Sequence, residues 1–427
     1  MTWIKKTYFT SCPVYKNSHA AFFKTFLFGA IILVFSTNQS YSQNNIDTLN
    51  HKLSSNIFIP NMNTTHPFGV LISRVHHDYR IEAPKTKSIT INIANANIWL
   101  PLVTGFIPIN QSDKDYVSQF AWHEREGALD FNTVPNQAIS LQADGIMRLY
   151  QLKFNMPIDS KSSLVASTRL LSFDSGKAPF SIVTNDKVIE WVHSNVAGGE
   201  DPFARKVYGV NSKANLYYSD RNDKSFSLNA GSTLISGFDA DYIYYPSVSI
   251  LNDKQIYFST GVHLGINTTK INPTIDIGTS FLLTKLKSIK NKNTLRFNFS
   301  YTLLRQGLVH YKSGVEIANR AFIHNTETSA SYTFKLKNNK FLSLISMMYY
   351  QNSWFKKDER SYMVIEGDRI TSHWYYAISH LYKKTAGVNL MASLQSNQWS
   401  YAIYVAEDIP VNNAPDIQTG VSVKMEW

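Results

Sequence analysis

The sequence predicts an all-β fold, a transmembrane antiparallel β-barrel of about 12–14 strands. Three observations lead to this prediction: long segments that alternate apolar with polar residues, few charged residues, and many aromatic ones. Of the 427 residues, 17% are charged and 13% are aromatic, whereas soluble domains carry about 25% charged residues. The aromatic content argues against disorder, and no apolar run reaches the roughly 18 residues that a membrane-spanning helix needs.

The alternating segments divide into an apolar and a polar face. Residues 256–267, 295–303 and 327–336 place mostly Ile, Phe, Tyr or Leu on one face and mostly Ser, Asn, Gly or Thr on the other. In a bilayer every backbone amide must be paired, so a sheet can span it only as a closed barrel with its apolar face outside. We therefore expect Arg296 and Lys335, on the polar faces, to point into the lumen. A soluble β-sandwich would also alternate, but with more Lys and Glu on its polar face.

Further strands are predicted over most of the chain. Their ranges are 88–100, 145–156, 162–173, 226–235, 271–283, 341–350, 371–382, 386–395, 399–407 and 416–427. The total is odd, whereas single-chain bacterial barrels have even strand numbers. Counting back from the C-terminus also puts residues 351–370 at the end of the barrel where turns should be short. Either a strand is hidden within 360–370, or one candidate is not a barrel strand.

The first 42 residues have the pattern of a secretory signal peptide. They contain four lysines and no acidic residue, an apolar run at 26–35, and the small-x-small site Ser40-Tyr41-Ser42. The only cysteine, Cys12, lies in this part, so we expect the exported chain to have neither a disulfide nor a cysteine-based metal site.

The exported chain is predicted to have two parts. Residues 43–65 are polar and rich in Asn, and we interpret them as an N-terminal arm. Residues 66–427 are predicted to form the barrel, with long loops near 104–143 and 174–212. Loops of this length are usually functional or flexible, and they could either lie outside the barrel or fold into its lumen.

The last predicted strand carries the most specific pattern. One face holds Ile417, Thr419, Val421, Val423, Met425 and Trp427, and the other holds Gln418, Gly420, Ser422, Lys424 and Glu426. This strand resembles the C-terminal signature of bacterial outer-membrane barrels, which ends in Phe or Trp and is read by the barrel-insertion machinery. Val421, Val423, Met425 and Trp427 would carry that signal. Together with the signal peptide, it predicts the outer membrane of a Gram-negative bacterium, with membrane lipids and the insertion machinery as partners.

A second resemblance lies in the first half of the chain. Asp144-Gly145 is followed by Trp191, His193 and Arg205. This order resembles a family of Gram-negative barrel proteins known only as a domain of unknown function, which has an Asp-Gly-Glu strand and then a Trp-His segment with a following Arg. Here Ile146 replaces the Glu. The resemblance implies an outer-membrane barrel over most of residues 66–427, and it implies no known activity.

A lipid hydrolase is one enzymatic hypothesis. His193-Ser194-Asn195 is similar to the His-x-Ser-Asn arrangement of outer-membrane phospholipases, in which the His takes the proton of the Ser. Adjacent residues of a strand point to opposite faces, so His193 and Ser194 would be badly placed for this chemistry. We therefore expect no enzymatic activity and keep lipid hydrolysis as the least favoured alternative.

Other motifs are better explained by structure than by chemistry. His123-Glu124-Arg125-Glu126-Gly127 lacks the second His of a zinc-protease helix, and Gly198-Gly199 lacks the Lys-Ser/Thr of a phosphate loop. The pair His76-His77 is expected at a strand end near the lipid headgroups. Trp354-Phe355 and the two following lysines fit the aromatic girdle of a membrane barrel better than a nucleic-acid site. We expect no cofactor, no metal and no nucleic acid.

Three functions remain as hypotheses. The polar lumen face favours a pore or a transporter for small or hydrophobic solutes. The long loops and the missing catalytic set favour a non-catalytic structural or surface-binding barrel almost as strongly, and the lipid hydrolase is the third. The sequence leaves open whether the lumen is empty, because small barrels fill their interior with side chains and larger ones enclose a channel or a plug.

Overall fold

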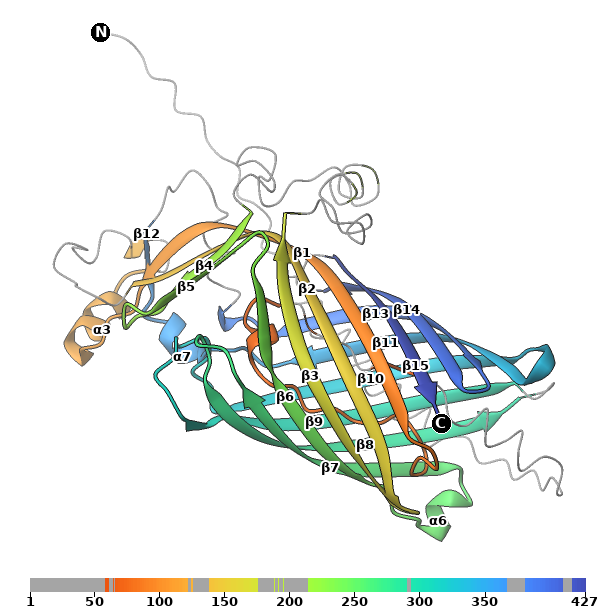
Figure 1. Cartoon of the computed structure of the whole chain (residues 1–427). Helices are drawn as coiled ribbons and strands as arrows, with labels where there is room; N and C mark the ends of the chain where they lie inside the picture. Colours follow the sequence, from red (N-terminus) through yellow and green to blue (C-terminus); the bar gives the residue numbers. More distant parts are fainter. Residues whose placement is uncertain are drawn as a thin grey trace, which may run out of the picture. The chain divides into compact units, whose positions relative to one another are not determined.

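The computed structural model describes residues 58–60, 64, 66–121, 124–125, 138–175, 188, 191, 195, 214–289, 293–366, 381–409 and 417–427. Of the fifteen strands in these ranges, twelve close into an antiparallel barrel (Figure 1). β1 pairs with β2 on one side and with β15 on the other, which closes the ring. The predicted fold class and the even strand number are confirmed. No helix in the described ranges is long and apolar enough to cross a membrane.

The barrel strands follow one another around the ring in chain order. They are β1 (Ser88–Phe106), β2 (Ala138–Asp159), β3 (Ser162–Asp174), β6 (Thr233–Tyr244), β7 (Ile256–Asn267), β8 (Thr274–Ser288), β9 (Thr294–His310), β10 (Phe322–Lys335), β11 (Lys340–Gln351), β13 (Thr385–Ser396), β14 (Trp399–Asp408) and β15 (Ile417–Glu426). Each joins its neighbour by antiparallel pairing, so the barrel is an up-and-down meander. Most strands reach or exceed the nine to eleven residues, roughly, that span a bilayer.

The alternation in the sequence becomes the two faces of the wall. In β7, Val262 is 57% exposed on the outside, whereas His263 is fully buried in the lumen. In β9, Arg296 is fully buried and points inward, as predicted. Lys335, at the last position of β10, lies on the inward face and is half-buried. The period of two therefore places the polar set inside and the apolar set where lipid would lie.

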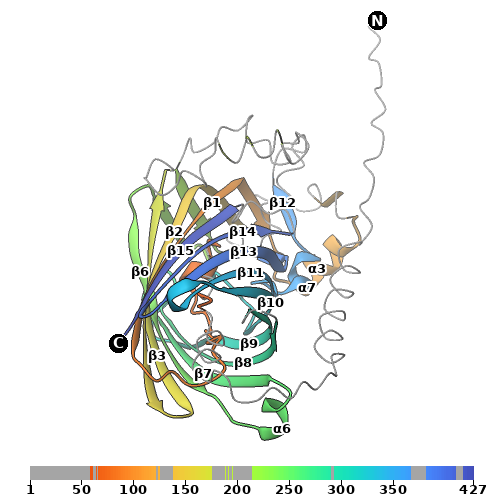
Figure 2. The same cartoon turned by 90° about the vertical axis from the view of Figure 1, so that its right-hand side faces the viewer.

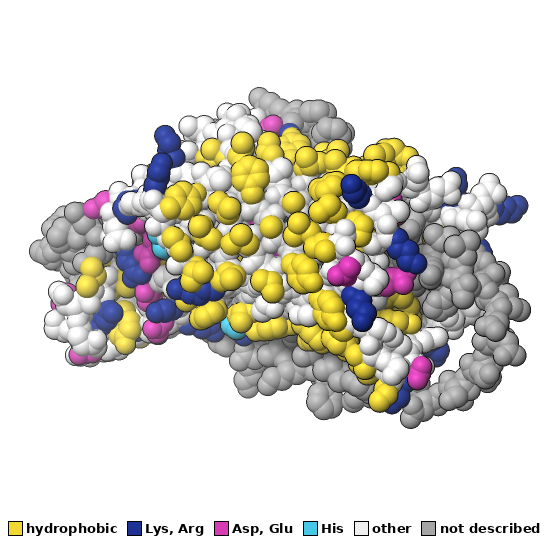
Figure 3. Space-filling view, turned by 60° about the horizontal axis from the view of Figure 1, so that its bottom comes forward, with side chains coloured by type: hydrophobic (Ala, Val, Ile, Leu, Met, Phe, Trp, Pro, Cys, Tyr) yellow, Lys and Arg dark blue, Asp and Glu magenta, His cyan; other side chains and the backbone are white. Residues whose placement is uncertain are grey.

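The outer surface is apolar around its middle. Figure 3 shows hydrophobic side chains spread over the strands on one face, with Lys, Arg, Asp and Glu gathered toward the two ends. On the outside, Val421 of β15 and Trp427, the residue after the end of β15, are each about half exposed. Trp427 lies beside Phe154, with ring centroids 6.1 Å apart. This distribution is the one a lipid-facing barrel needs: an apolar band with aromatic rings near its rim.

The two ends of the barrel differ. At one end, short turns join β2 to β3, β10 to β11 and β13 to β14, and Lys87 exchanges backbone hydrogen bonds with Trp427. At the other end the strands are joined by long connections, whose described parts are mainly residues 107–121, 214–232, 311–321, 352–366 and 381–384. We call these the short-turn end and the long-loop end. The segment after β11 lies at the long-loop end, which removes the conflict that the predicted strand count had raised.

Two strand predictions are wrong, and a third strand is found where it was predicted but outside the ring. The predicted strand 371–382 is not in the barrel, because β11 pairs directly with β13; its described residues, Leu381 and Tyr382, are helical, and the rest lie outside the described residues. The predicted strand 226–235 straddles a turn at Gly231, where φ is +89° and glycine is favoured. It divides into β5 (Ser225–Asn229) and β6. The predicted hidden strand exists as β12 (Val364–Glu366), which pairs with β1 outside the ring.

The long-loop end is covered by an apolar core. β1 and β2 stay paired as far as Phe106 and Ala138, and β4 (Asn215–Ser219) and β5 extend this sheet beyond the ring. The first long connection therefore begins later and ends earlier than predicted. Its side chains join those of the other long connections in one cluster, which includes Phe68, Leu71, Ile98, Leu141, Phe173, Leu216, Tyr218, Ile317, Trp354, Phe355, Leu381 and Tyr382. The described part of this core lies at the long-loop end of the barrel.

Candidate functional site: a lumen closed by its own chain

The chain before β1 lies inside the barrel. Residues 58–84, as far as they are described, form what we call the luminal segment, which the ring of strands surrounds (Figure 2). Leu71, Tyr79 and Ala83 are at most 5% exposed. Phe58 lies under the ammonium of Lys424, near the short-turn end. The lumen is therefore not empty, because this segment occupies part of it.

The luminal segment reverses its direction within the lumen. Thr64 touches Gly69 closely enough that a Cβ on that glycine would lie 2.8 Å from the Thr64 methyl group. Starting at this glycine, Gly69–Leu71 forms a single 3-10 turn (η1), and Val70 and Leu71 belong to the apolar core. The chain then descends to Lys87 at the short-turn end. Both limbs of the segment therefore connect to the short-turn end.

Side chains of the wall satisfy the backbone of the luminal segment. Three carbonyls accept from them: Arg169 Nη1 donates to Ile72 (2.7 Å), Asn272 Nδ2 to Leu71 (2.8 Å), and Arg296 Nη1 to Tyr79 (2.7 Å). A chain without secondary structure must find such partners when it is buried. Hydrogen bonds from the wall therefore hold the segment in place, in addition to its packing.

Two glycines of the wall make room for the segment. Gly265 on β7 and Gly278 on β8 both face inward. A Cβ on Gly265 would lie 2.2 Å from the Cβ of Ser73, and a Cβ on Gly278 would lie 2.5 Å from the Cγ2 of Val75. A larger residue at either position would collide with the segment as long as Ser73 and Val75 keep their own side chains, so glycine is favoured there by the close approach.

A buried polar network links the segment to β6, β7 and β8. Asp276 accepts from the hydroxyl of Ser73 (2.7 Å) and from Asn267 Nδ2 (2.7 Å). His263 contacts Asp241 (2.7 Å) and lies 3.2 Å from the same Ser73 hydroxyl. These groups are almost fully buried, where hydrogen bonds to charged groups are stronger than in water.

Glu327 of β10 is the main anchor of the descending limb. Its carboxylate lies 3.0 Å from Arg74 Nη2 and 3.0 Å from His77 Nε2, and it accepts from the Tyr79 hydroxyl at 2.6 Å. Glu327 is 5% exposed. Three residues of the segment therefore share one buried carboxylate, and its loss would remove the counter-charge of Arg74.

The lumen wall also makes apolar contacts with the segment. Inward side chains of β11, β13 and β14, namely Met347, Met391 and Tyr404, pack with Ile59 and Tyr79 of the segment. Polar side chains stand beside them on the same face, among them Asn389, Ser393 and Gln395 of β13. The wall is therefore mostly polar, with one small apolar patch.

The mouth at the long-loop end is held by ionic contacts as well as by the apolar core. Arg221, in the turn between β4 and β5, donates to both oxygens of Glu316 at 2.8 Å and to Glu359 at 3.1 Å. Hydrogen bonding to Glu316 raises the pKa of Arg221 further above its ordinary value. At the turn of the segment, burial lowers the pKa of His66 to about 3. His66 is therefore neutral, and its Nδ1 accepts from the Phe68 amide.

Replacing Arg221 by alanine is expected to loosen this mouth without unfolding the barrel. Two charge-assisted pairs are lost, which should lower the free energy of local opening by roughly 1–3 kcal/mol. Trypsin should then cut after Lys312, in the connection between β9 and β10, roughly 5–100 times faster. Arg221→Lys keeps the charge but loses the planar guanidinium. Its cleavage rate should therefore lie between those of the original chain and Arg221→Ala. Equal cleavage rates in all three proteins would contradict the role of Arg221.

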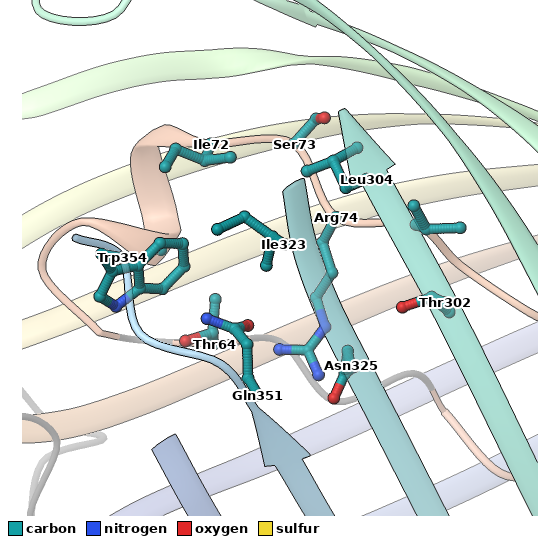
Figure 4. Close-up of a pocket in the computed structure, with 12 residues that line it drawn as sticks. Thr64, Ile72, Ser73, Arg74, Thr302, Leu304, Ile323, Asn325, Gln351 and Trp354 are labelled. Atoms are coloured by element: carbon teal, nitrogen blue, oxygen red, sulfur yellow. The ribbon is translucent and has the colours of Figure 1, made fainter. Parts of the chain in front are cut away.

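A small cavity lies between the turn of the segment and the wall (Figure 4). It has a volume of about 20 Å³, and Thr64, Arg74, Gln351 and Trp354 are among the residues that line it. The side-chain nitrogens of Gln351 and Trp354 have no partner within the described part of the chain. The space suits one bridging water and is too small for an organic solute.

The structure distributes the predicted site residues over different places. Asp144 is buried where β2 leaves the ring and pairs with β4, and Gly145 lies against the ring of Phe173, which leaves no room for a Cβ. Trp191 is 59% exposed. His193 and Arg205 lie outside the described residues, as does Ser194 of the hydrolase hypothesis. Of the family-like motif only Asp144, Gly145 and Trp191 are therefore described, and its role as one site stays a prediction.

Two interpretations of short motifs were wrong. His76 and His77 are not at a strand end near the headgroups; they are buried in the lumen, where His76 contacts Gln151 and His77 contacts Glu327. Trp354 and Phe355 are not in the aromatic girdle, because they are buried in the apolar core over the mouth. Both interpretations rested on the chemical type of the residues alone. Their positions depend on chain segments that fold into the lumen or over its mouth, which residue type does not reveal.

No protein-family model matches the sequence, and no curated protein matches it either. Solved structures with a similar fold include an outer-membrane channel from Pseudomonas putida F1 (7% identity, 81% of this chain and 98% of that one, TM-score 0.38). They also include the β domain of the Bordetella autotransporter BrkA (7%, 80% and 100%, 0.32) and the NanC porin (8%, 66% and 94%, 0.32). All three are outer-membrane β-barrel proteins, and at this similarity we transfer no activity from them.

Proposed function

We propose that the protein is an outer-membrane pore or transporter for small solutes, and that the luminal segment closes it in the state described here. One observation carries the proposal. From β2 to β10 the segment meets the wall through hydrogen bonds and ion pairs, centred on Asp276 and Glu327. Water can replace such contacts when the segment moves, whereas an apolar core would have no substitute. The wall exposed by that movement would be mostly polar, with a small apolar patch around Met347, Met391 and Tyr404.

The asymmetry of the ends supports an orientation. Outer-membrane barrels have short turns on the periplasmic side and longer loops outside the cell. The short-turn end would then face the periplasm, and the N-terminal arm would approach the lumen from there. A movement that withdraws the segment toward the periplasm would empty the lumen without breaking any strand pairing.

A disulfide that locks the segment to the wall tests this function. Cysteines at Val75 and Gly278 would have Cβ atoms within about 4 Å of each other, in the range of disulfides. The full chain carrying both cysteines should admit small solutes into liposomes when reduced and should lose this permeability when oxidised. Each single-cysteine variant serves as the control, since oxidation should leave its permeability unchanged. Equal permeability of the oxidised and reduced double variant would refute the proposed movement.

The second candidate function is a non-catalytic structural barrel. The apolar core over the mouth favours it, because Phe68, Leu71 and Trp354 tie the turn of the segment to the loops that seal the long-loop end. A barrel of this kind would be impermeable in both redox states. In that case, removing Arg221 or other mouth contacts would change the stability of the loops but not the passage of solutes.

A further inference from the structure

Four cationic side chains gather in the half of the lumen nearest the short-turn end. Arg80 comes from the luminal segment, Lys153 from β2, Arg296 from β9 and Lys424 from β15. Lys153 and Lys424 are both register partners of Thr90 on β1, so they lie at one level of the wall. All four face inward, where there is little water to screen them.

The carboxylates among these cations are fewer. Asp78 lies 3.3 Å from Arg80 Nε, and Glu426 lies 3.1 Å from Arg80 Nη2 and 2.7 Å from Lys424 Nζ. Asp78 also attracts Lys153, Lys424 and Arg296 at longer range. Two further acids lie nearby. Asp241 attracts Lys153 but contacts His263, and Glu82 is half-buried and forms no ion pair among the described residues. Asp78 and Glu426 are therefore the carboxylates in direct ion-pair contact with this group of cations, through Arg80 and Lys424.

Arg296 has an unused edge. It is fully buried, and only its Nη1 has a hydrogen-bond partner, the carbonyl of Tyr79. Its Nε and Nη2 have no hydrogen-bond partner within the described residues, and neither has the hydroxyl of Ser331, its register partner on β10. Nε and Nη2 lie along one edge of the planar guanidinium, and this fork matches two oxygens of a carboxylate or a phosphate. A buried charge without such a partner is costly.

We propose that Arg296, with Ser331 beside it and Lys153 and Lys424 in the same half of the lumen, forms a binding site for an oxyanion. The ligand is a small solute that carries a carboxylate or a phosphate group, bound through two of its oxygens to the free edge of Arg296. Binding itself needs only the geometry of the lumen. The further step, that such anions are the solutes that pass, rests on the proposed transport function.

Oxyanion-dependent stability of the full chain tests the site. The purified protein in detergent micelles is heated in sodium acetate, in sodium phosphate and in sodium chloride at equal ionic strength, and the midpoint of its heat-modifiable gel shift is measured. Acetate or phosphate should raise the midpoint above its value in chloride, because two oxygens can each accept one aligned N–H of the fork, whereas one chloride must share both. The two oxyanions separate a carboxylate site from a phosphate site. In Arg296→Gln the half-saturating concentration should rise roughly tenfold or more.

Arg169→Gln is the matched control. Arg169 is also a buried lumen arginine, but its guanidinium is engaged by Ile72, Asn267 and Asp239. Its loss should lower the midpoint in every salt and leave the oxyanion response intact. Ser331→Ala should weaken the response several-fold, and it decides the question if Arg296→Gln does not fold. Equal midpoints in the three salts would overturn the site, and so would an unchanged response in Arg296→Gln or in Ser331→Ala. A normal response in a protein that passes no solute would reject transport alone.

Discussion

Replacing Gly265 by alanine is expected to drive the luminal segment out of its place. The new methyl group would lie 2.2 Å from the Cβ of Ser73, and neither atom is the flexible end of a side chain. Overpacking of this kind costs about 1–3 kcal/mol. Because the cost falls only on the closed state, permeability to small solutes in liposomes should rise roughly 5–150-fold.

A second substitution distinguishes this collision from general damage. Ser73→Gly removes the Cβ that the new methyl group meets, so the double variant should regain much of the closed behaviour. The recovery will be partial, because the Ser73 hydroxyl also donates to Asp276. If Gly265→Ala is as impermeable as the original chain, or if Ser73→Gly makes the leak larger, the close packing of segment and wall is not what closes the lumen.

Replacing Glu327 by alanine is expected to free the descending limb of the segment. Arg74, His77 and Tyr79 all contact this carboxylate, so its removal leaves a mostly buried guanidinium without its counter-charge. Breaking a buried pair in this way costs roughly 3–5 kcal/mol. In a Val75→Cys background, the rate at which a water-soluble reagent labels the introduced thiol should rise about 10²–10³-fold.

The conservative variant sets the scale of this effect. Glu327→Gln removes the charge but keeps an oxygen that can accept from Tyr79, so its labelling rate should be intermediate. The exported chain is predicted to contain no cysteine of its own, so the reagent should label only the introduced thiol. Labelling of Glu327→Ala at the original rate would show that the carboxylate does not hold the segment.

The wall of the barrel was predictable from the sequence because the alternation that defines each strand lies within a short stretch of chain. A strand that separates lipid from a polar lumen must alternate, so residues 256–267 and 416–427 were found with nearly their observed limits and with the observed faces. Arg296 was assigned to the lumen for the same reason. Errors arose where alternation continued through a turn, as at Gly231, or where an apolar stretch served the core over the mouth, as at Leu381 and Tyr382.

The luminal segment was not predicted because its conformation depends on distant partners. Residues 66–84 have no regular period, and their backbone is satisfied by Arg169, Asn272 and Arg296, which follow much later in the chain. One signal was present in the sequence. His76-His77-Asp78-Tyr79-Arg80 stands just before the first strand, and a run so rich in polar groups is costly to bury unless a polar wall receives it. Gly265 and Gly278, both on polar strand faces, were a second sign that another chain passes close by.

The formation of one disulfide tests most directly whether the luminal segment occupies the lumen. Val75→Cys with Gly278→Cys should cross-link in native membranes under mild oxidation, and mass spectrometry should identify a peptide that joins positions 75 and 278. The matched pair Val75→Cys with Thr279→Cys should not cross-link, because Thr279 is exposed on the outer face of the same strand. The account predicts a high yield for the first pair and almost none for the second. Equal yields, or no cross-link at 75–278, would contradict it.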